Sequence, residues 1–298
     1  MNIFVSGLLN VETTVSVRGF PISYYPIDYP FFGVDSQVSG VGCNIARALT
    51  ALGDRVELVS FVGQDAEARR ILDRLRADGL STAGIRAELR RTPASVILYD
   101  PQGRRQIYCD LKDIQDRALR PEDHLDALRR CQAAALCNIN FNRPLLRTAR
   151  ELGVLTATDV HVLSTVEDDY NRDFMEQSDL LFLSDEALPC PPAEFLMRLR
   201  DRWHNRVIVL GRGAEGAMLL DDAMSRPETV PAYSHARPVN TVGAGDALFS
   251  AFLHFYAAGT PAWTALERAV VFAGIKIGFN GGAEGFCSER ELLARMEE

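Results

Sequence analysis

Short apolar runs alternate with longer amphipathic stretches along most of this chain. The runs end at glycine or polar turn residues, and they predict buried strands at residues 3–5, 55–62, 133–137, 154–157, 180–183 and 207–210. The stretches between them repeat their apolar positions at helical spacing, and they predict helices at residues 44–52, 66–78, 121–131, 144–152 and 193–203. Strands and helices that take turns in this way are typical of a parallel sheet covered by helices on both faces.

Two segments interrupt this alternation. Residues 11–38 contain several prolines and a cluster of aromatic side chains, namely Tyr24, Tyr25, Tyr29, Phe31 and Phe32. Residues 95–110 alternate in polarity around a Pro-Gln-Gly turn, as the two strands of a hairpin do. We expect the two segments to form one small sheet beside the main domain. A surface hairpin plus a long loop is the alternative, although structureless stretches of that length are uncommon in compact domains.

Length and charge narrow the possibilities. A chain of 298 residues is ordinary for a single α/β domain, here residues 1–298, that carries inserted segments at about 11–38 and 95–110. The formal net charge of −8 argues against a nucleic-acid partner, because binding to the phosphate backbone relies on clustered basic side chains. The densest basic stretches are residues 86–91 and the pair Arg104 and Arg105, and we interpret both as solvated faces.

The cysteines and the apolar segments carry no further signal. Six cysteines are scattered without C-x-x-C spacing and five histidines are equally dispersed, so neither a disulfide framework nor a zinc site is indicated. Residues 3–9 lack the basic start and cleavage site of a signal peptide, and no apolar run reaches the length of a membrane helix. We therefore expect a cytoplasmic protein with reduced cysteines and no membrane partner.

The sequence G-A-G-D at residues 243–246 is the strongest chemical signal. Small residues at Gly243, Ala244 and Gly245 allow successive backbone N–H groups to turn toward one point. The apolar run after Asp246 predicts a helix whose positive end faces the same point, which makes an anion hole. Asp246 either caps this helix or accepts a proton from a hydroxyl group.

Residues 241–246 (T-V-G-A-G-D) resemble the D-T-x-G-A-G-D signature of the PfkB carbohydrate kinases, with Asn240 in place of the leading Asp. A second stretch, S-G-V-G-C-N-I-A-R-A-L at residues 39–49, is followed by L-G at 52–53 and F-V-G-Q-D at 61–65. It resembles the family's N-terminal signature, and the two occur in the family's order.

The resemblance spans nearly the whole chain. It implies a ribokinase-like three-layer α/β/α sandwich with a mostly parallel central sheet and a small β-sheet lid. It also implies transfer of a phosphoryl group from ATP, with Mg²⁺, to the primary hydroxyl of a nucleoside, pseudonucleoside or sugar. Whether a monovalent cation is also needed stays open.

The resemblance assigns roles at the nucleotide end. Asp246 is the expected catalytic base, and the backbone of Gly243, Ala244 and Gly245 is expected to hold the charge that develops on the transferred phosphate. The residues expected at the nucleotide are Gly211, Gly213, Gly216, Thr241, Gly243, Gly245 and Gly274. Gly211 stands where the family usually has Thr, and no G-x-x-x-x-G-K-[ST] motif of a P-loop kinase occurs.

The metal position departs from the family pattern. The family's N-x-x-E motif falls on S-D-E-A at residues 184–187, so Ala187 stands where the Glu belongs. Ser in the first position resembles a fructokinase variant. Glu186 is the expected metal residue; Asp185 acting through water, or Mg²⁺ held mainly by the ATP phosphates, are the alternatives.

The acceptor site is expected near the first strand. Asn10 and Glu12 match the family's N-x-D, in which the acid binds sugar hydroxyls. The rest of the expected set is Gly40, Gly42, Asn44 and Asn138. Val41 stands where ribokinases usually have Lys, and the G-V-G spacing, with C-N-I at residues 137–139, resembles pseudouridine kinase.

That resemblance favours a nucleoside acceptor whose base stacks on the aromatic cluster. Lid core or a homodimer contact are the other interpretations of the cluster. A ribokinase- or fructokinase-type sugar kinase, or a noncatalytic PfkB-like regulatory protein, are the alternative functions.

Overall fold

The structure is a computed structural model that describes residues 1–233, 239 and 241–297. No helix in these described ranges is long and apolar enough to cross a membrane. Asn240, the first residue of the resemblance to the G-A-G-D signature, lies outside them.

The main body is built on one twisted sheet with the strand order β13-β12-β11-β10-β9-β8-β1-β4-β5. Its strands from β5 to β11 are parallel. At the other edge, β12 pairs antiparallel with β11, and β13 pairs antiparallel with β12. Their bounds are β1 (Asn2–Ser6), β4 (Arg55–Val62), β5 (Ile85–Ala87), β8 (Ala133–Leu136), β9 (Leu155–Val162), β10 (Leu180–Ser184), β11 (Val207–Gly211), β12 (Ala217–Asp221) and β13 (Glu228–Val230).

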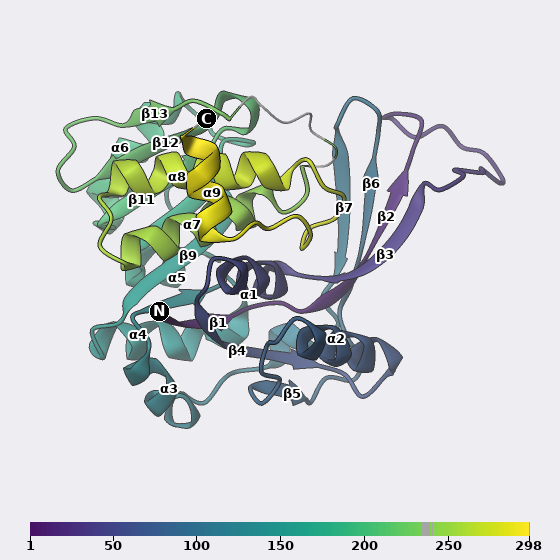
Figure 1. Cartoon of the computed structure of the whole chain (residues 1–298), viewed down its shortest axis with the longest axis horizontal. Helices are drawn as coiled ribbons and strands as arrows, with labels where there is room; N and C mark the ends of the chain where they lie inside the picture. The colour runs from purple at the N-terminus through teal and green to yellow at the C-terminus, as the bar shows by residue number, and fades with distance from the viewer. Residues whose placement is uncertain (234–238, 240, 298) are drawn as a thin grey trace.

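Helices cover both faces of this sheet, because successive residues of a strand point to opposite sides. In β1, Ile3 and Val5 pack in one hydrophobic core, whereas Phe4 packs in the other. The first core lies under α1 (Val41–Ala51), α2 (Ala66–Ala77), α7 (Ala244–Ala257), α8 (Ala262–Lys276) and α9 (Glu289–Met296). The second lies under α3 (Leu125–Arg130), α4 (Arg143–Glu151), α5 (Arg172–Gln177) and α6 (Pro192–Trp203). The expected three-layer α/β/α sandwich is therefore confirmed (Figure 1).

A second, smaller sheet stands beside the main body (Figure 1). It has the order β3-β2-β6-β7, formed by β2 (Asn10–Ser16), β3 (Val34–Ser39), β6 (Ala94–Tyr99) and β7 (Arg105–Asp110). The two segments that interrupt the alternation thus form one sheet, as predicted. Glu12 lies opposite Gln37 and Ser95, and Ser95 lies opposite Cys109, so these four side chains share one face of the sheet.

Most predicted elements agree with the structure within a few residues, and the exceptions are short. The helix predicted over residues 121–131 is a 3₁₀ turn, η2 (Pro121–Asp123), followed by α3, which begins only at Leu125. Further 3₁₀ turns are η1 (Ile114–Asp116), η3 (Asn140–Asn142) and η4 (Gly213–Glu215). The strands β5, β12 and β13 were not predicted; β5 and β13, the two edge strands, have only three residues each, too few to show a periodic pattern.

Candidate active site

The two sequence signatures meet where α1 and α7 begin. Asn44, in the first turn of α1, donates a hydrogen bond from Nδ2 to Oδ2 of Asp246 at 2.6 Å. Asp246 lies in the first turn of α7, whose N-terminal backbone N–H groups have no acceptor within the helix. The base and the acceptor motif predicted from the sequence are therefore in direct contact.

The backbone before Asp246 makes a tight turn at a glycine, within which the Ala244 N–H donates to Thr241 O at 3.2 Å. Gly243 caps α7 with a φ of 77°, a left-handed conformation that favours glycine. A Cβ at this residue would lie 2.3 Å from the carbonyl oxygen of Gly282. A Cβ on Gly245 would lie 3.9 Å from Oδ2 of Asp159, in ordinary contact, so this part of the loop is open toward Asp159. An anion placed here would face the positive end of α7.

The environment of Asp246 suits a base. The pKa of Asp246 is raised to about 6, mainly by burial and to a lesser extent by the nearby Asp159 carboxylate. The hydrogen bond from Asn44 and the charges of His161 and Lys276 act in the opposite direction. A carboxyl group whose pKa lies this close to neutrality takes up a proton more readily than an ordinary surface Asp.

A buried polar cluster on the small sheet adjoins this base. The Glu12 carboxylate, 5% exposed, accepts hydrogen bonds from Ser39 Oγ at 3.1 Å and Gln37 Nε2 at 3.3 Å. Ser39 Oγ also lies 3.2 Å from Asn44 Oδ1, so this hydroxyl joins the Glu12 side of the site to Asn44 and, through it, to Asp246. Burial raises the pKa of Glu12 against the effect of these donors.

Asn10 provides an unused acceptor beside this cluster. Its Nδ2 donates to Ser95 Oγ at 3.0 Å. Its Oδ1 is buried and has no hydrogen-bond partner among the residues that the structure describes. A buried polar atom without a partner costs free energy, and a ligand hydroxyl would satisfy this one.

The remaining predicted acceptor residues have other contacts. A Cβ on Gly40 would lie 2.5 Å from Leu8 O and one on Gly42 would lie 2.6 Å from the carbonyl carbon of Gly7. Both glycines therefore allow α1 to pack closely against the chain between β1 and β2. The Asn138 amide donates to Asn171 Oδ1 at 3.1 Å rather than to the Glu12 cluster.

The predicted nucleotide residues lie along the other side of α7. Gly211 ends β11, Gly213 begins η4, and Gly216 follows with a φ of 96°. A Cβ on Gly216 would lie 2.1 Å from Val230 O, so this glycine is required by the packing of the chain against β13. Gly274, in α8, lies against the ring of Tyr233, where a Cβ would come within 2.8 Å of a side-chain atom.

The carboxylates near the anion hole are the candidate contacts for Mg²⁺. No group of three or more His, Cys, Asp or Glu side chains that could hold a metal occurs among the described residues. The side chain of Glu186 is 60% exposed and pairs with Arg105 at 3.2 Å. Asp159, at the C-terminal end of β9, is the carboxylate next to Gly245. One carboxylate plus phosphate oxygens suits Mg²⁺, which usually keeps several waters, so these residues fit an ion delivered with ATP.

Three residues in this region were missed by the sequence analysis: Asp159, Arg105 and Lys276. Arg105, expected on a solvated face, reaches from β7 to Thr241 Oγ1 at 3.0 Å and to Glu186, whereas Arg104 pairs with Asp100 on its own hairpin. Nothing in the sequence distinguishes the two arginines. Lys276 did carry a signal, because it is a charged residue inside the apolar run V-V-F-A-G-I-K-I-G-F.

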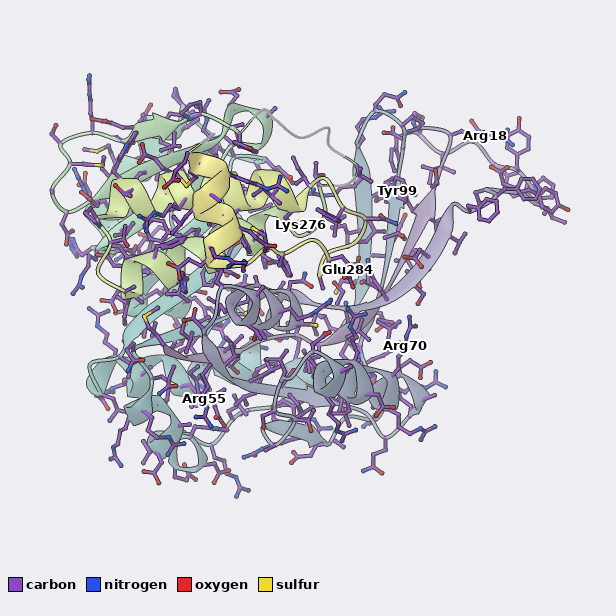
Figure 2. All side chains as sticks on the ribbon, in the orientation of Figure 1. Arg18, Arg55, Arg70, Tyr99, Lys276 and Glu284 are labelled. Carbon is purple, nitrogen blue, oxygen red and sulfur yellow. The ribbon has the colours of Figure 1, made fainter. Side chains whose placement is uncertain are left out.

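The aromatic cluster lies away from the base. Tyr24, Phe31 and Phe32 are 88%, 84% and 107% exposed, and the guanidinium of Arg18 stacks on Tyr25 at 4.7 Å. Figure 2 shows Arg18 on the outer side of the small sheet and Lys276 on the side of the main body. These aromatic side chains therefore do not line the Glu12 cluster.

Comparisons with known proteins place the chain in a family. The model of the pfkB family carbohydrate kinases matches residues 30–286. The acarbose 7(IV)-phosphotransferase of Actinoplanes sp. is 26% identical over 272 residues, which cover 91% of this chain and 90% of that protein. The ATP-dependent ribose-1-phosphate kinase of Halopiger xanaduensis is 25% identical over 258 residues, which cover 83% of this chain and 81% of that protein.

Solved structures show the same ribokinase-like fold. A microbiome-derived acarbose kinase has a TM-score of 0.86 at 24% identity, with 100% of this chain and 99% of that chain covered. The ribokinase of Arabidopsis thaliana, complexed with ribose and ATP, has a TM-score of 0.82 at 18% identity, covering 99% and 98%. Because the family match spans most of the chain and includes both motifs that meet at Asp246, this protein belongs to the pfkB family of carbohydrate kinases.

Proposed function

We propose that this kinase transfers the γ-phosphoryl group of ATP to a primary hydroxyl of a carbohydrate, with Asp246 as the base. The observation that carries the proposal is the contact of Asp246 with Asn44 at the positive end of α7. It puts a carboxyl group of raised pKa beside a backbone that favours negative charge, and beside a polar cluster suited to hydroxyl groups. Phosphoryl transfer needs these three features in one place.

In this mechanism the acceptor hydroxyl approaches Asp246, which takes up its proton as the new O–P bond forms and the bond from the γ-phosphorus to the β–γ bridging oxygen of ATP breaks, so that ADP leaves. The backbone N–H groups of Gly243 and Gly245 hold the negative charge of the transferred group, and the Ala244 N–H joins them once it turns away from Thr241 O. ATP brings the phosphoryl group together with Mg²⁺, and Asp159 is the carboxylate placed to contact that ion. The chain's main contribution is to orient the two substrates and to stabilise charge.

The acceptor binds through its ring hydroxyls. The Glu12 carboxylate accepts hydrogen bonds, and Asn10 Oδ1 is an open acceptor, so the cluster matches adjacent hydroxyl groups that donate. A ring held there leaves its exocyclic CH₂OH free to reach Asp246. The named activities of the two curated relatives, on acarbose and on ribose-1-phosphate, support a carbohydrate acceptor.

A nucleoside acceptor has less support. Val41 and the spacing of its motif favour it, but the aromatic side chains that would stack a base lie on the outer end of the small sheet. The small sheet acts as a lid in this proposal, since Arg105 links β7 to Thr241 next to the anion hole.

A panel of acceptors tests the proposal. Phosphoryl transfer from ATP is measured to acarbose, ribose-1-phosphate, ribose, fructose, inosine and pseudouridine at one ionic strength. We expect transfer to a carbohydrate with the highest kcat/KM. Faster transfer to a nucleoside than to every carbohydrate would contradict the acceptor class. Binding of ATP without transfer to any acceptor would favour the noncatalytic alternative.

A further inference from the structure

A lysine side chain lies buried beneath the anion hole. Lys276 is the last residue of α8 and is 0% exposed, and its Nζ donates hydrogen bonds to the carbonyl oxygens of Val242 and, at 2.6 Å, Gly281 (Figure 2). Lys112 and Lys276 are the lysines of this chain, in which the other basic side chains are arginines. A compact ammonium can bind two converging carbonyl oxygens, for which a planar guanidinium is poorly shaped.

The carbonyl of Val242 connects Lys276 to the phosphate half of the site. The carbonyl of Val242 and the N–H of Gly243 belong to the same planar peptide unit and point in opposite directions. A positive charge on the carbonyl end polarises the unit and strengthens the N–H end as a donor. That N–H belongs to Gly243, the first residue of the anion hole.

The carbonyl of Gly281 connects Lys276 to the acceptor half of the site. The carbonyl of Gly281 shares its peptide unit with the N–H of Gly282. The Gly282 N–H donates to the Glu12 carboxylate and lowers the pKa of Glu12. The same ammonium therefore polarises a donor that holds the acceptor-binding carboxylate.

We propose that Lys276 is a built-in cation that positions both halves of the site, and that its ammonium takes the place of a bound monovalent cation. The ammonium polarises one peptide unit whose N–H lies at the anion hole and another whose N–H donates to Glu12. The expected effect of Lys276 on turnover rests on the kinase mechanism proposed above. The expected effect on ion binding and the charge state of Lys276 do not depend on that mechanism.

The surrounding charges favour the ammonium form of Lys276 at neutral pH. Asp246, Glu12 and Glu284 stabilise the charged form of Lys276, while burial and Arg105 oppose it. Burial lowers the pKa of Lys276 to about 8, so the ammonium is the main form at neutral pH. It is covalently part of the chain, buried and bound to two carbonyl oxygens, so it cannot leave the site as a free ion can.

The wild-type protein gives the first test. Turnover and ATP binding are measured in potassium, sodium and tetramethylammonium chloride at equal ionic strength, so that screening is constant. At equal ionic strength the three salts can differ only in specific ion binding. Because the Lys276 ammonium replaces the bound ion in this proposal, we expect turnover and ATP affinity to agree within about twofold. Activation of about tenfold or more by potassium or sodium, corresponding to about 1.4 kcal/mol, would overturn the proposal.

Spectroscopy of the lysines gives a second test that does not depend on activity. With nitrogen-labelled lysine, the spectrum contains side-chain signals from Lys112 and Lys276 alone. We expect one ammonium signal with slow hydrogen exchange at neutral pH, from Lys276, and it should disappear in Lys276→Met. A rapidly exchanging or neutral Lys276 side chain would contradict the proposal. This readout remains valid if no acceptor is found and the proposed function fails.

Variants separate charge from packing. Lys276→Met keeps the length of the side chain without its charge, and Lys276→Gln keeps a donor without the charge. We expect both to lower kcat by about a hundredfold, the order that the loss of one anion-hole donor costs, and to raise the acceptor KM. Lys112→Met, which removes the exposed lysine, is the matched control and should be unaffected.

If the Lys276 charge positions the site, the alkaline limb of the pH profile should disappear in Lys276→Gln. If the side chain acts by packing alone, the limb should remain. Full turnover in Lys276→Met would contradict the proposal. Should these variants fail to fold, the ion dependence and the lysine spectrum of the wild-type protein decide.

Discussion

Asn44 and Asp246 lie 202 positions apart in the chain, and yet the amide of the first donates to the carboxylate of the second at 2.6 Å. The bond joins the start of α1 to the start of α7. The Ser39 hydroxyl, whose single proton is shared between the Glu12 carboxylate and Asn44 Oδ1, places the Glu12 cluster next to Asn44. We therefore expect acceptor binding and proton transfer to be coupled through Asn44.

Replacement of Asn44 should shift the pH dependence. The hydrogen bond from Asn44 favours the ionised form of Asp246 and so lowers its pKa. In Asn44→Ala we expect the acidic limb of the kcat/KM profile to move to higher pH by about one unit, equivalent to about 1.4 kcal/mol. Thr50→Val, at the other end of α1, should leave the limb in place. An unchanged limb in Asn44→Ala would contradict the coupling.

The wild-type profile should have two limbs. Activity should rise with pH as Asp246 loses its proton, near its pKa of about 6, and should fall as Lys276 loses its proton, near its pKa of about 8. The signs follow because the base acts when ionised and the lysine when charged. Asp159 and His161 also face Asp246, so the measured values are those of the coupled group. A profile that stays flat through the acidic range would exclude Asp246 as the base.

Asp246→Asn should separate binding from chemistry. The substitution keeps the shape of the side chain but removes the base, so we expect turnover to fall by at least ~10²-fold. The backbone that holds phosphate is unchanged, and the affinity for ATP measured by calorimetry should therefore stay close to the wild-type value. Near-normal turnover would refute the assigned role.

Glu12→Gln should act on the acceptor alone. The amide keeps the size of the side chain but loses the charge and one acceptor oxygen, while Ser39 and Gln37 still surround it. We expect kcat/KM for the acceptor to fall by about ten- to a hundredfold, the cost of roughly 1–3 kcal/mol for polar groups left unpaired. The KM for ATP serves as the internal control. An equal rise in the KM for ATP would contradict this role.

Arg105 should govern the position of the lid. It links β7 to Thr241 and Glu186, and its loss removes both contacts. In Arg105→Ala we expect faster hydrogen exchange across β6 and β7, because local opening becomes easier, and a higher KM for ATP. Arg104→Ala is the matched control, since that side chain pairs with Asp100 on the same hairpin. Exchange that rises equally in both variants would argue against a specific link.

The layered fold follows from local pattern in the sequence. Apolar runs such as residues 55–62 and 180–183 cannot stay exposed, and their alternation with amphipathic helices leaves a parallel sheet between two helical layers as the stable arrangement. The motif ending at Asp246 can likewise be recognised locally, because small residues before a helix start leave its backbone N–H groups accessible to an anion.

Tertiary structure alone decided which distant side chains meet. Arg104 and Arg105 are neighbours of identical type, but Arg104 lies in the turn that Asp100 closes, whereas Arg105 begins β7 and reaches Thr241. The aromatic cluster faces outward because β2 and β3 carry its connection beyond the sheet. Lys276 reaches the carbonyls of Val242 and Gly281 because α8 ends beneath both loops, a packing relation that no local pattern encodes.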